Sequence, residues 1–218
     1  MRRGSLRRRH LNALLAGAAA AWPRGAVAQA PVKVYRIGLL NSGAPITDNS
    51  PFGAPLIRGL AQYGYVLGRN LALERRGADL HMDRLPRLVA ELAANAVDVI
   101  VTIGYPPAVA AKQGTTLPVV VYGGGDPVAT KLVASLARPG GHLTGISDVS
   151  AELTTKRLEL IKQFAPALRR VAVLWNADDF AMTLRYRAAE ASAMAIGVSV
   201  QPLGVREPDL ISTKRSRR

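Results

Sequence analysis

Cysteine is absent from the 218 residues, and this excludes disulfides, thiolate metal sites, cysteine nucleophiles and a lipid-modified cysteine anchor. Histidine is scarce, because only His10, His81 and His142 occur, and no pair has the spacing of metal ligands. The HExxH and GxSxG patterns are also missing. We therefore expect no catalytic constellation, no metal site and no cofactor, and we do not expect the chain to be an enzyme.

The glycine-rich stretch GGGDPVATKLVASLARPGG (123–141) lacks the spacing of a phosphate-binding loop. GxxxxGK[ST] is absent because Lys131 is not preceded by glycine, and Val128 stands where GxGxxG requires its last glycine. A dinucleotide-dependent enzyme is therefore disfavoured. Two readings of Asp126 stay open: an N-cap followed by proline at the first helical position, or a ligand contact at the rim of a cleft.

The formal charge of +14 is concentrated at the two ends of the chain. Residues 1–30 carry six arginines and no acid, and the final KRSRR adds four cations, which leaves +4 for residues 31–213. A folded body with that charge has an ordinary solvated surface, so we expect no nucleic-acid partner.

The first thirty residues have the three-part layout of a secretory leader. MRRGSLRRRH is a cationic region, LNALLAGAAAAW is an apolar run too short to span a bilayer, and small residues offer cleavage near Ala28 or Ala30. Arg8-Arg9 loosely fits a twin-arginine signal, so the export route stays open. The sequence predicts an exported, periplasmic protein.

Beyond the leader, short apolar runs alternate with amphipathic segments. This pattern predicts an α/β fold with parallel sheets and helices on both faces. Four strands are expected in the first lobe at 34–40, 70–74, 98–103 and 118–122, with helices at 54–63, 84–95, 106–113 and 128–137.

The second half begins with an extended piece at 143–147, and we interpret residues 143–150 as a crossing between two Rossmann-like lobes. A helix from Ser150, strands at 171–175 and 198–203 and a helix at 180–196 then predict a second, incomplete lobe, since two strands and two helices cannot cover both faces of a sheet. The expected division is a signal peptide over 1–30, a first lobe over 31–145, a partial second lobe over 146–206 and a basic tail over 207–218.

The candidate site lies where the first-lobe strands end, because open α/β sheets bind ligands outside the carboxyl ends of their strands. Asn41–Pro45, Gly104–Pro107 and Gly123–Asp126 each follow a predicted strand. We expect these loops to converge, with helix N-termini after Ser42 and Tyr105 suited to a ligand carboxylate. Asp178-Asp179 fits a turn and helix N-cap better than acid–base chemistry.

Eight collinear segments carry a family likeness, among them IGLLNSGAP, DRLPRLVAEL, GGDPVATKLVASLARPGG and LTTKRLELIKQFAP. They resemble the bacterial ABC-transporter substrate-binding proteins of the tryptophan-binding-like type, over about residues 33–206. The resemblance implies two lobes of the type I periplasmic binding protein kind that close over a small, amino-acid-like ligand, and an ABC permease as partner. It places Ser147 and Asp148 at the crossing and assigns the ligand loops to Ser42, Gly43, Tyr105, Pro106, Gly125, Asp126 and Asn176.

Two departures from the family pattern bear on this interpretation. Tyr105 stands where relatives commonly have a small hydroxyl residue, and the chain stops where relatives continue through the second lobe and back into the first. The alternatives left open are a truncated product without function, in which ligand binding is weak or lost, and a sugar-repressor-like sensor. The sensor is disfavoured because a leader occupies the place of the helix-turn-helix it needs.

Overall fold

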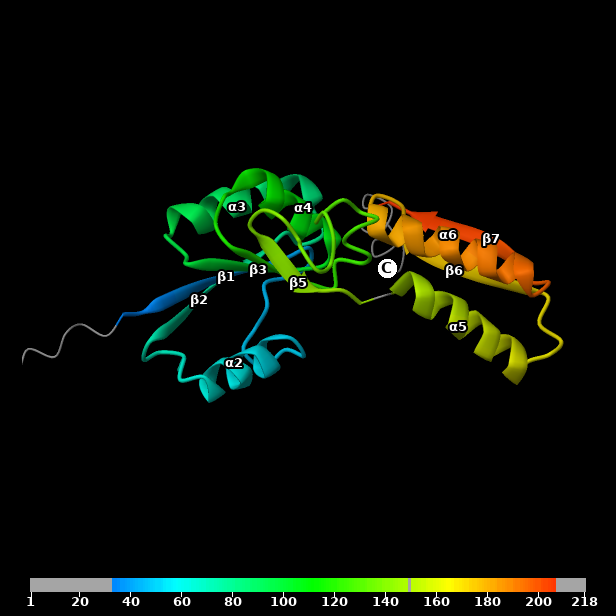
Figure 1. Ribbon diagram of the computed structural model, residues 1–218, viewed down its shortest axis with the longest axis horizontal. Helices are drawn as coiled ribbons and strands as arrows, with labels where there is room; N and C mark the ends of the chain where they lie inside the picture. The colour runs from blue at the N-terminus through cyan, green and yellow to red at the C-terminus, as the bar shows by residue number, and fades with distance from the viewer. Residues whose placement is uncertain (1–32, 149, 207–218) are drawn as a thin grey trace, which may run out of the picture. The chain divides into compact units, whose positions relative to one another are not determined.

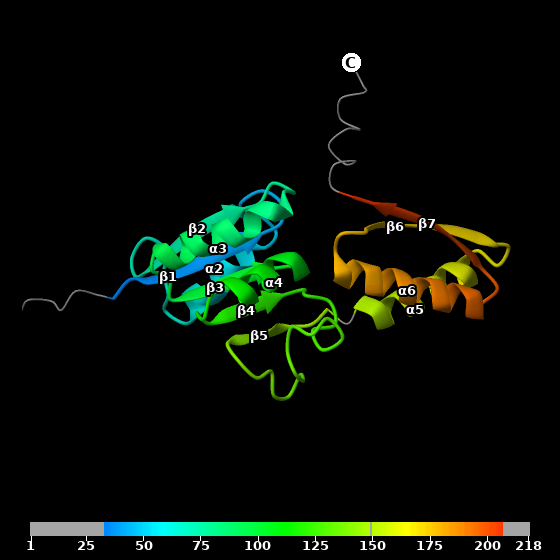
Figure 2. The same cartoon turned by 90° about the horizontal axis from the view of Figure 1, so that it is seen from above.

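The computed structural model describes residues 33–148 and 150–206 (Figures 1 and 2). The expected leader over 1–30 and basic tail over 207–218 lie outside these residues. The chain divides at Lys33 into two units, and the elements described below belong to the second, Val34–Arg218. No helix within the described ranges has the length and apolar character needed to cross a membrane.

The first sheet is built from five parallel strands in the order β2-β1-β3-β4-β5. The three central strands of this sheet are largely apolar in sequence because each is covered on both faces. In β1, for example, Leu39 is 1% exposed and Leu40 is 0% exposed although they point to opposite faces. The strands are β1 (Tyr35–Asn41), β2 (Leu71–Gly77), β3 (Val99–Ile103), β4 (Val119–Tyr122) and β5 (Leu143–Ile146).

Helices cover both faces of this sheet (Figure 1). On one face α3 (Leu85–Ala94), entered through the short 3-10 turn η1 (Met82–Arg84), and α4 (Tyr105–Gly114) bury a core around Leu40, Ile100 and Val119. On the other face α2 (Gly53–Gln62) packs against a smaller core around Ile37 and Leu39.

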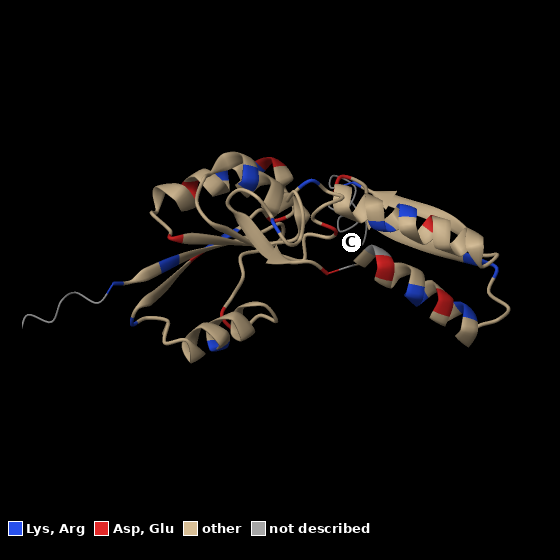
Figure 3. Ribbon diagram, in the orientation of Figure 1, with Lys and Arg blue, Asp and Glu red and all other residues tan. Residues whose placement is uncertain are grey.

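The second sheet has two parallel strands, β6 (Arg170–Asn176) and β7 (Ser199–Val205). Helices α5 (Ser150–Phe164) and α6 (Phe180–Ala195) bury Leu158, Ala189, Ala193 and Val198 against it. Leu174 is 67% exposed and Leu203 is 41% exposed, so this sheet keeps apolar side chains in contact with solvent. Charges of both signs are interspersed over the helices (Figure 3).

The expected α/β class with parallel sheets is confirmed, and the elements predicted up to Gly114 are all present. The expected helix at 128–137 is wrong, because the segment forms consecutive turns instead. Lys131 adopts a left-handed backbone with φ 58°, which a continuous helix does not allow. The N–H groups of Leu132 and Val133 both reach back to the carbonyl of Pro127.

The interpretation of residues 143–150 as a crossing is wrong for their first half. Leu143–Ile146 is a fifth strand of the first sheet, where the sequence predicted four, and it pairs in parallel with β4. A short alternating segment carries a weak strand pattern, and its pairing depends on Gly145. A Cβ at Gly145 would lie 2.0 Å from the carbonyl oxygen of Val121, so only glycine lets β5 approach β4 at this point.

Candidate ligand site

The site is defined by the strand order of the first sheet. All five strands are parallel, so their carboxyl ends meet at one edge. In the order β2-β1-β3-β4-β5 the chain leaves β1 in one direction and β3 in the other, and such a switch point is where doubly wound sheets bind ligands. The loops after β1 and β3 flank this point.

The loop after β1 holds Ser42 and Gly43 and is fixed by backbone bonds. The carbonyl of Ser42 accepts from the N–H of Leu80 at 2.8 Å, and that of Gly43 from Asp79 at 3.1 Å. Helix α2 begins only at Gly53. The helix expected at 54–63 is therefore present, but nine residues or more separate its N-terminus from Ser42 and Gly43.

The loop after β3 opens α4 but offers few donors to an anion. Gly104 takes a left-handed φ of 86° as N-cap, and its N–H is already bonded to the carbonyl of Tyr122 at 2.9 Å. Pro106 and Pro107 have no N–H. Of the four groups that a helix start normally leaves free, Tyr105 alone retains an N–H for a ligand.

The loop after β4 places Gly125 and Asp126 at the same edge. Gly123 and Gly125 have φ values of 68° and 74°, which glycine adopts without strain. The Asp126 carboxylate accepts hydrogen bonds from the N–H groups of Val128 and Ala129, each at 3.0 Å. Asp126 thus caps a turn, and its side chain is exposed.

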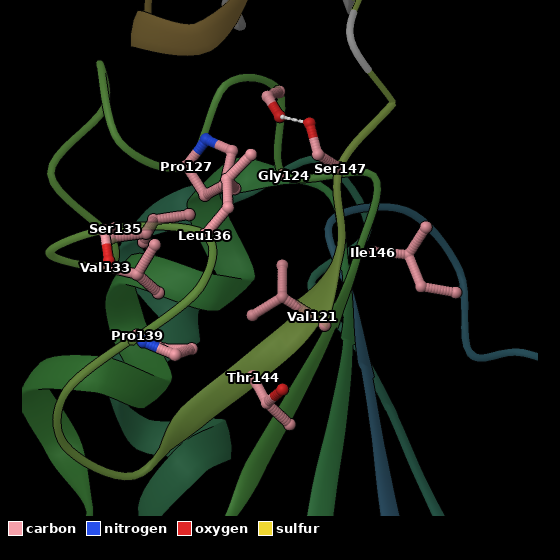
Figure 4. Close-up of a pocket in the computed structure, with 13 residues that line it drawn as sticks. Val121, Gly124, Pro127, Val133, Ser135, Leu136, Pro139, Thr144, Ile146 and Ser147 are labelled. Atoms are coloured by element: carbon pink, nitrogen blue, oxygen red, sulfur yellow. Dashed lines mark hydrogen bonds between the residues drawn. The ribbon is translucent and has the colours of Figure 1, made fainter.

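The segment leaving β5 ties this loop to α6. Ser147 donates its hydroxyl to the carbonyl of Gly125 at 3.0 Å (Figure 4). One carboxylate oxygen of Asp148 accepts from the N–H of Ser150 at 3.2 Å, and the other contacts Nη2 of Arg185 at 2.5 Å. Asp148 and Arg185 form an ion pair in which both side chains are about two thirds buried.

Arg185 is a site residue that the sequence did not reveal. Its Nη2 lies 3.9 Å from the position a Cβ would take on Gly125, and that Cβ would meet the Cβ of Ala181 at 2.9 Å. The Nε of Arg185 is buried and has no hydrogen-bond partner among the described residues. From the sequence, an arginine within a predicted helix is expected to face solvent. The only residue in the sequence that pointed to a partner for Arg185 was Asp148, the acid at the predicted crossing.

The turn before α6 holds Asn176 and Asp179. The side chain of Asn176 accepts from the N–H of Asp178 at 2.9 Å, and Asp179 accepts from the N–H of Met182 at 3.0 Å. The N-cap interpretation of Asp179 is thereby confirmed. Burial raises the pKa of the Asp179 carboxyl, while hydrogen bonds from Met182 and Ala181 and the charge of Arg185 oppose the shift.

Two aromatic rings lie next to these charged groups. The rings of Tyr105 and Phe180 have their centroids 6.2 Å apart, within the range of favourable aromatic pairs. Burial, followed by the negative charge of Asp179, raises the pKa of the Tyr105 hydroxyl. The site therefore combines aromatic surface with both signs of charge.

Two hollows accompany the site. A cavity of about 70 Å³ lies behind the loop after β4, lined among others by Val121, Gly124 and Leu136 (Figure 4). It is far smaller than the 300–1,000 Å³ typical of small-molecule pockets. An apolar hollow of about 360 Å³ beside α2 is lined by Leu39, Phe52, Tyr122 and neighbouring residues. Separately, the described residues hold no group of three or more His, Asp or Glu side chains placed to bind a metal.

Comparison with known proteins decides the family. Residues 53–215 match the family described as ABC transporter substrate binding protein. The chain belongs to this family. A curated relative, the tyrosine-binding protein of Clostridioides difficile (strain R20291), is 31% identical over 136 residues, which are 62% of this chain and 38% of the relative. The resemblance noted in the sequence is confirmed.

Solved structures extend the likeness to the fold. A conserved domain protein of Vibrio cholerae superposes with a TM-score of 0.71 at 25% identity, over 79% of this chain and 58% of that one. An ABC domain in complex with L-Trp from Streptococcus pneumoniae gives 0.68 at 24% identity over the same shares. The chain thus spans well under two thirds of the length of these relatives.

Proposed function

We propose that this chain carries the ligand-binding surface of an extracytoplasmic solute-binding component of an ABC importer, and that the ligand is a small amino acid-like molecule. The observation that carries the proposal is the convergence of the loop after β4, the segment after β5 and the start of α6. Ser147 donates a hydrogen bond to Gly125, and Asp148 pairs with Arg185, so these contacts join the three segments at the carboxyl edge of the sheet. Family membership supports the class of function.

The ligand class follows from the chemistry at this edge. An aromatic amino acid needs apolar ring surface together with partners for an ammonium and a carboxylate. Tyr105 and Phe180 supply rings, Arg185 supplies a positive charge, and the exposed Asp126 supplies a negative one. The names of the tyrosine-binding relative and of the L-Trp complex agree with such a ligand. The proposed contact residues are Ser42, Gly43, Tyr105, Pro106, Gly125, Asp126 and Asn176.

We further propose the partner and the location that this class of function requires. An ABC permease in the inner membrane would receive the loaded protein, and the leader over 1–30 would direct export to the periplasm, with cleavage near Ala28 or Ala30. A division into lobes at about 31–145 and 146–206 agrees with the two separate sheets. Mass spectrometry of the exported chain should show a start at Gln29 or Pro31.

Isothermal titration of the purified chain tests the function. L-Tyrosine, L-tryptophan, L-leucine and ribose are titrated in turn, and saturable heat is expected with an aromatic amino acid and none with ribose. Gly125→Val is the negative control and should lose this heat. The valine side chain would collide with Ala181, and the φ of 74° at position 125 disfavours a β-branched residue. Failure of all three amino acids to bind would overturn the proposal.

A further inference from the structure

The carboxyl edge of the first sheet offers few of the backbone donors that usually bind an anion, because the start of α4 leaves only the N–H of Tyr105. Helix α2 starts at Gly53, far along the chain from Ser42, and the segment after Asp126 is not a helix. The first turn of α4 contains two prolines, which have no N–H, and the N–H of Gly104 already donates to the carbonyl of Tyr122. A ligand carboxylate at this edge therefore needs a charged side chain.

Arg185 has unused hydrogen-bonding capacity at this edge. A guanidinium carries five N–H donors in a planar fork that matches a carboxylate. One terminal nitrogen is engaged with Asp148, whereas Nε is buried without a partner among the described residues. A buried donor left unpaired is costly, and a ligand oxygen would remove that cost. The side chain is still 29% exposed, so a ligand can reach the guanidinium.

We propose that Arg185 binds the carboxylate of the ligand and that Asp148 is the positioning residue that holds the guanidinium against the loop at Gly125. The inference rests on the proposed function and names the recognition element within that site. Asp148 is suited to this role because its carboxylate is itself fixed by the N–H of Ser150.

The surrounding charges restrict the class of ligand further. Asp148 contacts Arg185 directly, and Asp179 lies near enough that the charge of Arg185 opposes the rise in its pKa caused by burial. Two carboxylates beside one guanidinium leave an excess of negative charge, which disfavours a simple carboxylate and favours a ligand that also carries an ammonium. The recognised class is therefore the α-amino acids, with the carboxylate at Arg185.

The experiment compares amino acids with the amines that lack only the carboxylate. L-Tryptophan and tryptamine, and L-tyrosine and tyramine, are titrated into the full chain and into Arg185→Gln. Arg187→Gln is the matched control, because Arg187 lies exposed on the same helix and the change removes the same charge. Circular dichroism and melting of each variant establish that it is folded.

Arg185→Gln should weaken binding of the amino acid about 10- to 100-fold, the scale of a charge-assisted hydrogen bond, and leave binding of the amine unchanged. Arg187→Gln should change neither. Should Arg185→Gln fail to fold, Arg185→Lys keeps the charge but loses the fork, and it should still weaken the amino acid selectively.

Equal losses for acid and amine, or no loss for either, would overturn the role of Arg185 while leaving the proposed function intact. If L-tryptophan and L-tyrosine both fail to bind the unmodified chain, this inference is overturned; if L-leucine fails as well, the proposed function is overturned with it. Asp148→Asn supplies a further readout, because loss of positioning should reduce the preference for acid over amine, whereas a merely structural role would weaken both equally.

Discussion

The ammonium of Lys112 on α4 donates a hydrogen bond to the backbone carbonyl of Lys131 at 2.6 Å. Lys131 itself has a left-handed φ of 58°, a conformation that costs a residue with a Cβ about 1–2 kcal/mol. The bond from α4 thus holds the loop after β4 at a strained residue, and this loop also carries Gly125 and Asp126.

Lys131→Gly should raise the free energy of unfolding by about 0.5–1 kcal/mol. Glycine removes the left-handed penalty, and the greater backbone entropy of an unfolded glycine offsets part of the gain. The bond from Lys112 is retained because its acceptor is a backbone carbonyl. Urea denaturation measures the change, and Lys131→Ala, which keeps a Cβ, should show no gain. A less stable glycine variant would contradict the inference that the backbone of Lys131 is strained.

The sequence was sufficient where burial determines the element. DVIVTI over 98–103 has no alternative to a buried strand, and β3 is Val99–Ile103. It was insufficient at 128–137, because helical spacing of apolar residues says nothing of the left-handed turn at Lys131. It also missed the ion pair of Asp148 with Arg185, since its partners lie on different elements and are joined only by the tertiary fold.

Asp126 has a structural and an electrostatic role that two substitutions separate. Asparagine caps as well as aspartate, so Asp126→Asn should keep the stability conferred by the bonds to Val128 and Ala129. If Asp126 also supplies the counter-charge for the ligand ammonium, Asp126→Asn should weaken L-tryptophan and tryptamine alike by roughly 1.5–3 kcal/mol.

Asp126→Ala should in addition lower the unfolding free energy by about 1 kcal/mol, the value of a lost cap. Titration calorimetry and thermal melting of both variants distinguish the roles. Unchanged affinity in Asp126→Asn, together with lower stability in Asp126→Ala, would show that Asp126 serves only as a cap.

The raised pKa of Asp179 gives stability a defined dependence on pH. Burial raises this pKa above its unfolded value near 3.8, so the folded state holds the proton more tightly than the unfolded state. The contribution of Asp179 to stability is therefore fully present below the unfolded pKa and is lost as pH rises through the folded pKa. At neutral pH the buried charge opposes folding.

Asp179→Asn should consequently be more stable than the unmodified chain at pH 7, and the difference should vanish as pH falls below about 4. The asparagine side chain still accepts from the N–H of Met182. Asp178→Asn is the control, because Asp178 is exposed and pairs with Arg206. A variant less stable at pH 7 would show that the charge near Arg185 outweighs burial.

The two sheets should differ in resistance to local opening. Strand β1 lies between β2 and β3 and buries Leu39 and Leu40 on opposite faces, whereas within residues 33–148 and 150–206 β7 pairs only with β6. The core between β6–β7 and the helices consists largely of the small side chains of Ala189, Ala193 and Val198 with Leu158. Because this core has few buried apolar contacts, the free energy of local unfolding should be low.

Hydrogen exchange followed by mass spectrometry should therefore show strong protection for 35–41 and 99–103 and weak protection for 199–205. Equal protection would mean that another surface covers the exposed side chains of Leu174 and Leu203. Repeating the measurement at a tenfold lower concentration identifies that surface: protection supplied by a second copy of the chain falls on dilution, because association depends on concentration, whereas protection from within one chain does not.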